Sequence, residues 1–275
     1  MMATESSTQT RVVLWSIPRC MTTAFMRSID TLDESVVFHE NFAAAYWHGP
    51  EGNHKNLFSF APYHTYDYVK ALLQQEMPGK RVIFAKDFAF ALQRKFEKIP
   101  DGYIHTFLIR NPTKVFMSLR YQFKVPWLKA IFFGREMQTY YPEHNFYFVD
   151  MWKLYVHIKD DLKKPTLVID VDDFLQDPEA MMKIYCQSTG IPFRTSMLSW
   201  QPCSIWNVDW QCSTYLKYFA WWQGWYKSTF NSNGFETSKG QTNTPEITML
   251  PPDVRKLVEI SEPYYKLLYD ERITI

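Results

Sequence analysis

The segment from Ser16 to Thr23 carries side chains suited to holding an anion, between a short apolar stretch and a stretch with helical spacing. Arg19 offers a charged, forked donor, and two threonines offer hydroxyl groups. The first N–H groups of a helix have no acceptor within the helix, and the helix dipole favours a negative charge there. The sequence therefore predicts an anion-binding turn made of Pro18, Arg19, Cys20, Met21, Thr22 and Thr23.

This turn differs from the GxxxxGK[ST] loop of nucleotide triphosphatases. Ser16 stands at the first glycine, Met21 at the second, and Thr22 at the position of the lysine. Because the lysine and both glycines are missing, we do not expect a loop that hydrolyses ATP or GTP.

A second strand-end segment, Ile109 to Ser118, places an arginine and a serine where they can share an anion. Arg110 leaves the end of an expected strand, and Asn111 and Pro112 are typical of a helix start. Taken alone, the pattern fits an ordinary helix start with a surface arginine equally well. Together, the two turns predict two phosphate sites on one sheet, matching a donor with phosphates at its 5′ and 3′ positions.

The elements that must position these turns alternate along the chain as short apolar stretches and stretches of helical spacing. Such alternation is typical of a parallel sheet covered by helices on both faces. The segment 46–66 is rich in His, Gly, Asn and Pro and is expected to be a loop. We expect strands at 11–17, 35–38, 81–85, 104–109 and 166–171, and helices at 22–32, 68–75, from 112 onward, 145–162, 178–189 and 252–269.

The overall composition fits one large α/β domain. Apolar residues make up 46% of the 275 residues, enough for a substantial core. Lys and Arg number 30 against 29 Asp and Glu, and no basic stripe is present, so we expect no nucleic-acid partner. We expect a disordered polar tail at 1–10 and a single domain at 11–275.

Targeting and metal-binding signals are not recognisable in this sequence. The first ten residues lack the pattern of a signal peptide, and no apolar run is long enough to span a bilayer. The cysteines show no CxxC spacing, so neither a disulfide framework nor a zinc site is expected; they are Cys20, Cys186, Cys203 and Cys212. These features predict a cytoplasmic protein with reduced thiols, no membrane partner and no metal.

On these motifs the chain resembles the superfamily of sulfotransferases that use 3′-phosphoadenosine-5′-phosphosulfate (PAPS). The family's loop for the 5′-phosphosulfate is similar to residues 18–23, and its 3′-phosphate motif, an Arg with a Ser eight positions later, is similar to Arg110 and Ser118. Residues 168–193 also resemble a strand, Asp-Pro helix and Gly-Ile-Pro-Phe turn of that family. The chain looks closest to sulfotransferase-like proteins labelled branched-chain-aminotransferase-like, although we find no motif for a pyridoxal-phosphate lysine.

The resemblance implies a P-loop-type central parallel sheet, PAPS as co-substrate, and 3′-phosphoadenosine-5′-phosphate as product, without a metal. Three departures stand out. Cys20 replaces a hydroxyl residue, and Ala24 stands where related enzymes place an adenine-stacking Trp. The late Arg-Lys-Gly motif is missing, and either Ser228, Thr229 and Phe230 or Lys239 and Gly240 are candidates to replace it in donor binding. Phe88 stands where the family's catalytic His is expected.

Transfer to a hydroxyl group needs donors at the leaving oxygen and a base for the acceptor proton. Arg19, the loop amides and Lys86 are the candidates for the leaving oxygen. For the base, Glu40 and His39 follow the second expected strand, and Asp87 is a third candidate. Glu40 matches the position of a catalytic Glu in bacterial-type relatives, whereas the ordinary pKa of His suits a base near neutrality. The alternatives remain open: a structural His39, and a solvated Lys86 paired with Asp87.

The chain is rich in aromatic residues, with 21 Phe, 17 Tyr and 10 Trp. Some of these rings will fill the core, and others can line an acceptor pocket. Together with the missing basic tracks, they favour a small hydrophobic or aromatic hydroxyl compound over a polysaccharide. The candidates for acceptor contacts are Phe42, Tyr46, Trp47, Asp87 and Trp206.

The sequence thus predicts an enzyme that moves a sulfuryl group from PAPS to a small hydroxyl acceptor. Two alternatives stay open: a non-catalytic protein that binds PAPS or another nucleotide, and a P-loop kinase acting on a small molecule. The kinase would need a lysine-bearing loop and ligands for Mg²⁺, neither of which the motifs supply.

Overall fold

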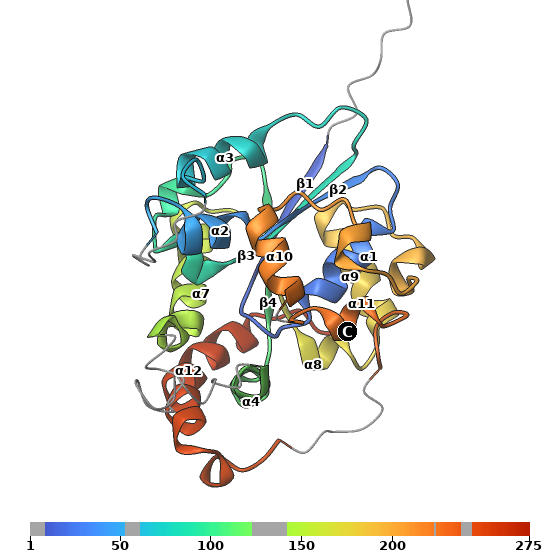
Figure 1. The fold of residues 1–275 in the computed structure, drawn as a ribbon. Helices are drawn as coiled ribbons and strands as arrows, with labels where there is room; N and C mark the ends of the chain where they lie inside the picture. Colours follow the sequence, from blue (N-terminus) through green and yellow to red (C-terminus); the bar gives the residue numbers. More distant parts are fainter. Residues whose placement is uncertain (1–8, 53–60, 123–141, 223, 238–243) are drawn as a thin grey trace, which may run out of the picture.

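A sheet of five parallel strands forms the centre of the molecule in the computed structural model, which describes residues 9–52, 61–122, 142–222, 224–237 and 244–275 (Figure 1). The strand order is β2-β3-β1-β4-β5, and every neighbouring pair is parallel. The strands are β1 (Thr10–Ser16), β2 (Ser35–His39), β3 (Val82–Phe88), β4 (Ile104–Ile109) and β5 (Thr166–Asp170).

The strands form because each is a short, almost continuous apolar run, the pattern of a strand buried on both faces. In β1, Val12 to Trp15 are all completely buried. All five expected strands are confirmed, with one change at the end of β3. Lys86 and Asp87 lie within this strand rather than after it, because its pairing with β1 continues to Phe88, opposite Ser16.

Helices cover both faces of the sheet, as the sequence predicted. Figure 1 shows α1 and α9 on one side, and α7 and α12 on the other. The helices are α1 (Thr22–Asp30), α2 (Asn41–His48), α3 (Tyr66–Gln74), α4 (Pro112–Gln122), α7 (Tyr147–Val156), α8 (Val171–Phe174), α9 (Pro178–Thr189), α10 (Thr214–Trp222), α11 (Lys227–Phe230) and α12 (Pro252–Asp270).

Four of these helices, α2, α8, α10 and α11, were not expected. The segment predicted as a loop at 46–66 begins inside α2 and ends where α3 starts at Tyr66, and its residues 53–60 lie outside the description. The helix expected at 145–162 is divided, because α7 ends at Val156 and a π-helical turn follows at His157–Asp161. No helix within the described ranges is long and apolar enough to cross a membrane.

Local signals define the ends of α9, as its sequence indicates. Asp177 accepts a hydrogen bond from the N–H of Ala180, and Pro178 occupies the first turn. The helix ends at Gly190, whose φ of 74° is a left-handed conformation that glycine adopts without a steric penalty.

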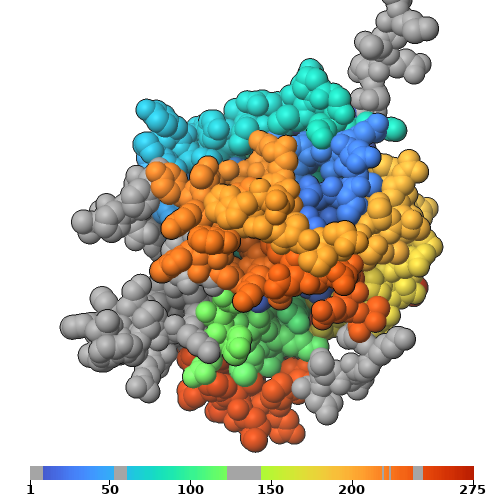
Figure 2. Space-filling model, turned by 45° about the vertical axis from the view of Figure 1, so that its right-hand side comes forward, coloured from blue at the N-terminus to red at the C-terminus, as the bar shows by residue number. Residues whose placement is uncertain are grey.

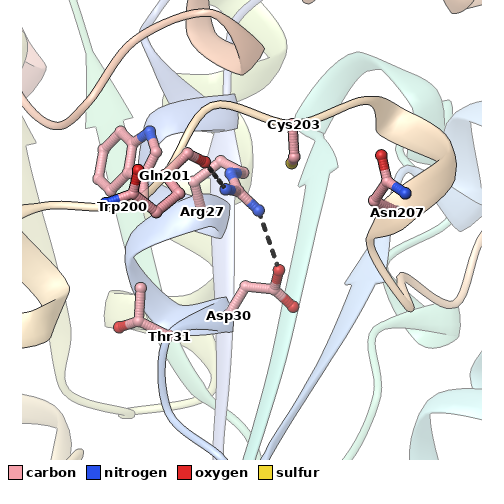
Figure 3. A pocket seen from close by; sticks show the side chains of 7 residues that line it. All are labelled: Arg27, Asp30, Thr31, Trp200, Gln201, Cys203 and Asn207. Carbon is pink, nitrogen blue, oxygen red and sulfur yellow. Dashed lines mark hydrogen bonds and ion pairs between the residues drawn. The ribbon is translucent and has the colours of Figure 1, made fainter.

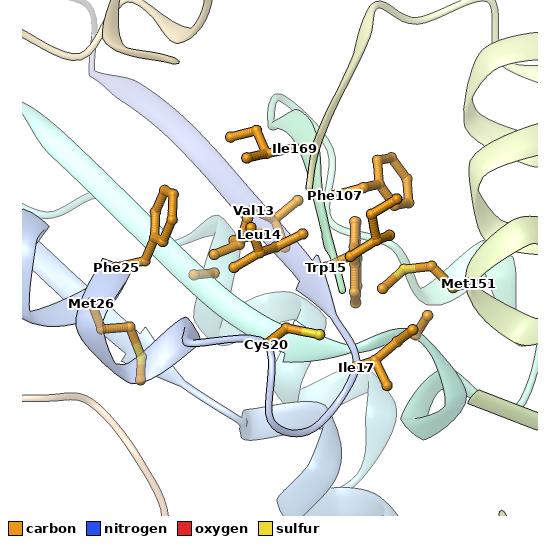
Figure 4. Packing of buried hydrophobic residues seen from close by; sticks show 14 of the residues in the cluster. Val13, Leu14, Trp15, Ile17, Cys20, Phe25, Met26, Phe107, Met151 and Ile169 are labelled. Atoms are coloured by element: carbon orange, nitrogen blue, oxygen red, sulfur yellow. The ribbon is translucent and has the colours of Figure 1, made fainter. Parts of the chain in front are cut away.

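The segment between β1 and α1 is anchored in the core beneath the end of the sheet. Ile17 and Cys20 are almost completely buried, and Figure 4 shows the thiol of Cys20 turned toward Ile17 across the loop. Because these side chains face inward, the backbone of the loop is held against the end of the sheet. Figure 2 shows α10 and its flanking segments, in orange, lying across one face between α3, in cyan, and α4, in green.

Candidate functional site

The ends of four neighbouring strands bring the predicted site residues to one edge of the sheet. His39 pairs with Lys86 in the β2–β3 register, and Ser16 pairs with Phe88 on one side and Leu108 on the other. The carboxyl ends of these strands are therefore aligned. As a result, the loop after β1, the turn after β2 and the start of α4 lie at the same edge of the sheet. This edge also includes the point where the strand order reverses around β1, the usual place for a ligand in such a sheet.

The two predicted anion-binding turns are in direct contact. The Nε of Arg19 donates a hydrogen bond to the Oγ of Ser118 at 2.9 Å, and the Nη1 of Arg110 donates to the backbone carbonyl of Arg19 at 2.9 Å. The carbonyl of Trp225 lies 3.4 Å from the Nη1 of Arg19. Three segments that are distant in the sequence therefore surround one guanidinium group.

Two positive charges lie side by side in this contact, without a matching negative charge. Burial and the neighbouring Arg110 both lower the pKa of Arg19. In the part of the chain that the structure describes, neither Arg19 nor Arg110 is paired with a carboxylate. The Nε of Arg110 is buried and has no hydrogen-bond partner among the described residues. A buried donor without a partner is costly, so the geometry suits an anion that bridges the two arginines.

The backbone of the loop adds further donors. Arg19 and Met21 have positive φ angles of 69° and 57°, a left-handed conformation that is unusual for residues other than glycine. Such local conformations turn successive N–H groups toward one side and form anion-binding concavities. Met21 is also the residue before α1, and no side chain caps that helix. The opening amides of α1, at Thr22 and Thr23, therefore have no acceptor within the helix.

Cys20 requires a correction, because its side chain cannot bind the donor. The residue is completely buried, and burial raises the pKa of its thiol to about 12. The thiol is therefore neutral and packed in the core. Only the backbone of Cys20 remains available to an anion.

Glu40, Lys86 and His39 form a hydrogen-bonded group with Tyr226 at the ends of β2 and β3. The ammonium of Lys86 donates to Oε1 of Glu40, and their side chains are only 1% and 5% exposed. The hydroxyl of Tyr226 donates to Oε2 of Glu40 at 3.3 Å and lies 2.9 Å from Nε2 of His39. The ammonium of Lys86 also lies 3.4 Å from the ring centre of Phe88.

The alternative of a solvated Lys86 paired with Asp87 is wrong, because Lys86 is buried and its partner is Glu40. Glu40 itself is held in an unusual backbone conformation, with a φ of 53° between β2 and α2. Its N–H donates to the carbonyl of Lys86 at 2.8 Å, which fixes the turn. A non-glycine residue in this conformation costs of order 1 kcal/mol, and such residues are often found at functional sites.

Electrostatics favour an ionised Glu40 and a neutral His39. Burial alone would raise the pKa of Glu40, but the charge of Lys86 and the hydrogen bonds of Lys86 and Tyr226 outweigh it and lower the pKa. Burial lowers the pKa of His39 to about 4, although Glu40 opposes this shift. Burial lowers the pKa of Lys86, and the charge and hydrogen bond of Glu40 oppose that shift. The direct contact between the two side chains favours a carboxylate paired with an ammonium, beside an uncharged imidazole.

Asp87 has a structural position that sequence reasoning did not anticipate. Its Oδ2 accepts the N–H of Phe42 at 2.6 Å, and its Oδ1 accepts the N–H of Ala43 at 3.0 Å and of Phe88 at 2.9 Å. The carboxylate thus caps the start of α2. Burial raises its pKa to about 7 despite these hydrogen bonds. With its oxygens engaged by the backbone, Asp87 is neither a free base nor an acceptor contact in this structure.

The predicted aromatic contacts are spread over different places. Phe42 is completely buried and lies between the rings of Trp15 and Tyr66, so its assignment to an acceptor wall is wrong. Tyr46 is 6% exposed and packs edge-on against Trp47 and Phe90, which also makes it largely a core residue. Trp206 is 46% exposed and lies edge-on to Trp221 of α10.

Ser228 and Thr229 lie in α11, directly after Tyr226 and Lys227. Ser228 is exposed and Thr229 is half-buried. Their role in donor binding stays a prediction.

Tyr226 is the functional candidate that sequence reasoning missed. It lies in a Trp-rich segment with no clear period, and nothing in its neighbours singles it out. Its position follows from the path of the segment after α9, which returns to lie beside β2: Gln211 pairs with Phe38, and Trp210 packs on His39. Only this long-range packing brings the hydroxyl to Glu40.

A separate recess of about 310 Å³ lies along the second half of α1 (Figure 3). Arg27 lies within it, donating to the carbonyl of Gln201 at 2.8 Å and pairing with Asp30 at 3.4 Å. The recess shares no lining residue with the groups at the strand ends. Across the described ranges, no group of three or more His, Cys, Asp or Glu could hold a metal ion.

Comparisons with known proteins agree with this fold. Residues 157–268 match a family model described as a sulfotransferase domain. A sulfotransferase from Alicyclobacillus acidocaldarius has a similar solved structure, with a TM-score of 0.51, 13% identity and 96% of each chain covered. At this identity the likeness shows the fold, a single α/β unit. The predicted resemblance to sulfotransferases is therefore confirmed.

Two curated relatives come from Arabidopsis thaliana. Branched-chain-amino-acid aminotransferase-like protein 1 is 33% identical over 104 residues, which are 38% of this chain and 16% of the relative. Branched-chain-amino-acid aminotransferase-like protein 2 is 25% identical over 274 residues, 92% of this chain and 40% of the relative. The chain thus spans less than half the length of the curated relatives it matches. The two predicted anion-binding turns lie before the region matched by the family model.

Proposed function

We propose that this protein transfers the sulfuryl group of PAPS to the hydroxyl of a small acceptor. The single observation that carries the proposal is the contact between the two strand-end turns. Arg110 donates to the carbonyl of Arg19, and Arg19 donates to Ser118, so one elongated anion can reach both turns at once. A donor with phosphates at its 5′ and 3′ positions has this character.

The missing partner of Arg110 supports the assignment. Its buried Nε lacks an acceptor, and Ser118 has a hydroxyl that can bind an anion once Arg19 turns away. We assign these two residues to the 3′-phosphate. The 5′-phosphosulfate then lies against the opening amides of α1, where the helix dipole and the left-handed loop both favour negative charge.

The proposed transfer step uses the two substrates and side-chain and backbone groups of the protein. The acceptor oxygen attacks sulfur, and the bond between sulfur and the bridging phosphate oxygen breaks, leaving 3′-phosphoadenosine-5′-phosphate. The acceptor proton passes to a base, so the products are a sulfate ester, the bisphosphate and a protonated base. Arg19, Lys86 and the loop amides supply donors where charge builds on the leaving oxygen, each contributing about 3 kcal/mol.

Glu40 and His39 are the candidates for that base. Both lie at the end of β2, and Lys86 joins Glu40 to the strand that adjoins the loop. Asp87 is the weaker candidate, because its oxygens cap α2. The sulfuryl group carries less negative charge than a phosphoryl group, so the step does not require a metal.

The acceptor is proposed to be a small hydrophobic or aromatic alcohol or phenol. The segment that covers the site edge carries Trp206, Trp210 and Trp225, and Trp206 is half exposed. Aromatic rings offer broad apolar contact with a few polar positions, the usual character of a small-molecule pocket.

The test is transfer of ³⁵S-labelled sulfate from PAPS to a panel of phenols and alcohols. We expect the wild type to form a labelled sulfate ester. Of Glu40→Gln and His39→Ala, the variant that removes the base should form none. A protein that binds the bisphosphate tightly but transfers no label to any acceptor would be a PAPS-binding protein without this activity. Stronger thermal stabilisation by ATP with Mg²⁺ than by the bisphosphate would instead favour the kinase.

A further inference from the structure

Tyr226 connects the two candidate bases. It is the residue immediately before α11, and its hydroxyl lies 2.9 Å from Nε2 of His39 and 3.3 Å from Oε2 of Glu40. The ring also packs edge-on to that of His39, with centres 5.3 Å apart. This contact joins residues that are more than 180 positions apart.

When both contacts of the Tyr226 hydroxyl are hydrogen bonds, proton counting allows one arrangement of these three groups. A tyrosine hydroxyl has one proton to donate and lone pairs that accept. Glu40 is ionised beside Lys86 and has no proton to give, so the Tyr226 proton must point at Oε2. His39 then has to donate from Nε2 to the hydroxyl oxygen. A neutral histidine has one N–H, so Nδ1 carries the lone pair.

The surroundings of His39 fit this arrangement. Its Nδ1 is buried and has no hydrogen-bond partner among the described residues. An unprotonated ring nitrogen without a partner is less costly than a buried N–H that lacks an acceptor. The ring is also in contact with Trp210, with centres 5.4 Å apart, which restricts its rotation.

We infer that Tyr226 is a positioning residue of the transfer site, whose hydroxyl holds His39 as a donor and thereby leaves the Glu40 carboxylate to take the acceptor proton. The inference rests on the proposed function for its catalytic meaning, but the contact can be tested without activity. It selects between two bases that sequence reasoning left open.

The hydroxyl also adjusts the basicity of Glu40. A hydrogen bond to the ionised form lowers the pKa of a carboxyl group, and Tyr226 contributes such a bond to Glu40. Removing the hydroxyl should raise the pKa of Glu40, so the acidic limb of a pH–rate profile should move to higher pH. Other charged or titratable groups also act on His39, Glu40 and Tyr226. Lys86 and Asp87 lie on β3, and Arg19 lies in the loop after β1. Cys212 lies just before α10, and Lys217 lies within it.

The direct experiment is ¹⁵N-histidine NMR of the wild-type protein. The chain has seven His, and the spectrum of His39→Gln identifies the signals of His39. We expect a neutral ring protonated at Nε2 at pH 7. A wild-type ring protonated at Nδ1 would overturn the inference, whether or not any variant folds or any acceptor is known.

The kinetic experiment compares Tyr226→Phe with Tyr218→Phe, which removes a hydroxyl from an exposed tyrosine of α10. For Tyr226→Phe we expect kcat to fall about 10- to 100-fold, the acidic limb to rise in pH, and bisphosphate affinity to stay within about twofold. Tyr218→Phe should match the wild type. An unchanged acidic limb in folded Tyr226→Phe would refute the positioning role. A wild type that transfers no sulfate would refute the proposed function alone, since the NMR result stands separately.

Discussion

Arg19 donates from Nε to the Oγ of Ser118 at 2.9 Å, although 99 positions separate the two residues. The loop after β1 and the second turn of α4 are thereby in contact, with the carbonyl of Arg19 also accepting from Arg110. Two cations and a serine hydroxyl therefore lie together at the ends of adjacent strands, where we propose that the phosphates of the donor bind.

Arg110→Ala should weaken the binding of 3′-phosphoadenosine-5′-phosphate by about 10- to 100-fold, since a hydrogen bond to a charged group contributes about 1.5–3 kcal/mol. Adenosine 5′-phosphosulfate, which lacks the 3′-phosphate, should bind wild type and variant almost equally. Isothermal titration calorimetry measures both ligands. Arg194→Ala, at an exposed arginine, is the matched control. Equal losses for both ligands would show that Arg110 does not contact the 3′-phosphate.

Lys86→Met should destabilise the protein by about 3–5 kcal/mol, because it leaves the buried Glu40 carboxylate without its cation. The double variant Glu40→Gln with Lys86→Met should recover much of this loss, since no buried charge remains. Urea unfolding measures both values. Lys183→Met removes an exposed i,i+4 pair with Glu179 and should change stability by less than about 1 kcal/mol. Additive losses in the double variant would contradict a coupled buried pair.

Asp87→Ala should cost about 2–3 kcal/mol, because it removes the acceptor for two N–H groups at the start of α2. Asp172→Ala, which breaks a partly exposed pair with Lys114, is the comparison and should cost less than about 1 kcal/mol. Thermal unfolding and sulfate transfer are measured together. If Asp87→Ala were fully stable yet inactive, Asp87 would have a chemical role instead of capping α2.

The stability of the protein should fall in acid partly through His39. Its pKa in the folded state is lowered to about 4 by burial, whereas an unfolded histidine titrates near 6.5. The unfolded chain therefore binds a proton first as the pH drops. The contribution of neutral His39 to stability is complete above about pH 6.5 and is lost as the pH falls toward about 4.

Between pH 6.5 and 4, the unfolding free energy of His39→Gln should therefore decline less steeply than that of the wild type. The difference in slope should correspond to the uptake of up to about one proton on unfolding. Denaturant unfolding at a series of pH values measures the slope. The variant keeps part of the decline, because burial also lowers the pKa of His105 and His144, each to about 3. Identical slopes would mean that His39 is not held neutral in the folded protein.

Much of the fold was predictable because its signals are local. The strands are continuous apolar runs, and helices such as α9 begin and end with capping residues that short-range hydrogen bonds explain. α2 was missed because its cap, Asp87, comes from a distant strand, and its first residue follows Glu40 in a left-handed conformation.

Local sequence patterns were enough to predict the strands, most of the longer helices, and the two turns whose arginines, threonines and amides suit an anion. Their side-chain chemistry and their places at strand ends are local properties. Three features follow from long-range packing: the pairing of Lys86 with Glu40, the core position of Phe42, and the contact of Tyr226 with His39. These contacts depend on which strands become neighbours and on how the segment after β5 folds back across the sheet edge. Because the residues are far apart in the sequence, the residues that flank each of them do not indicate the contact.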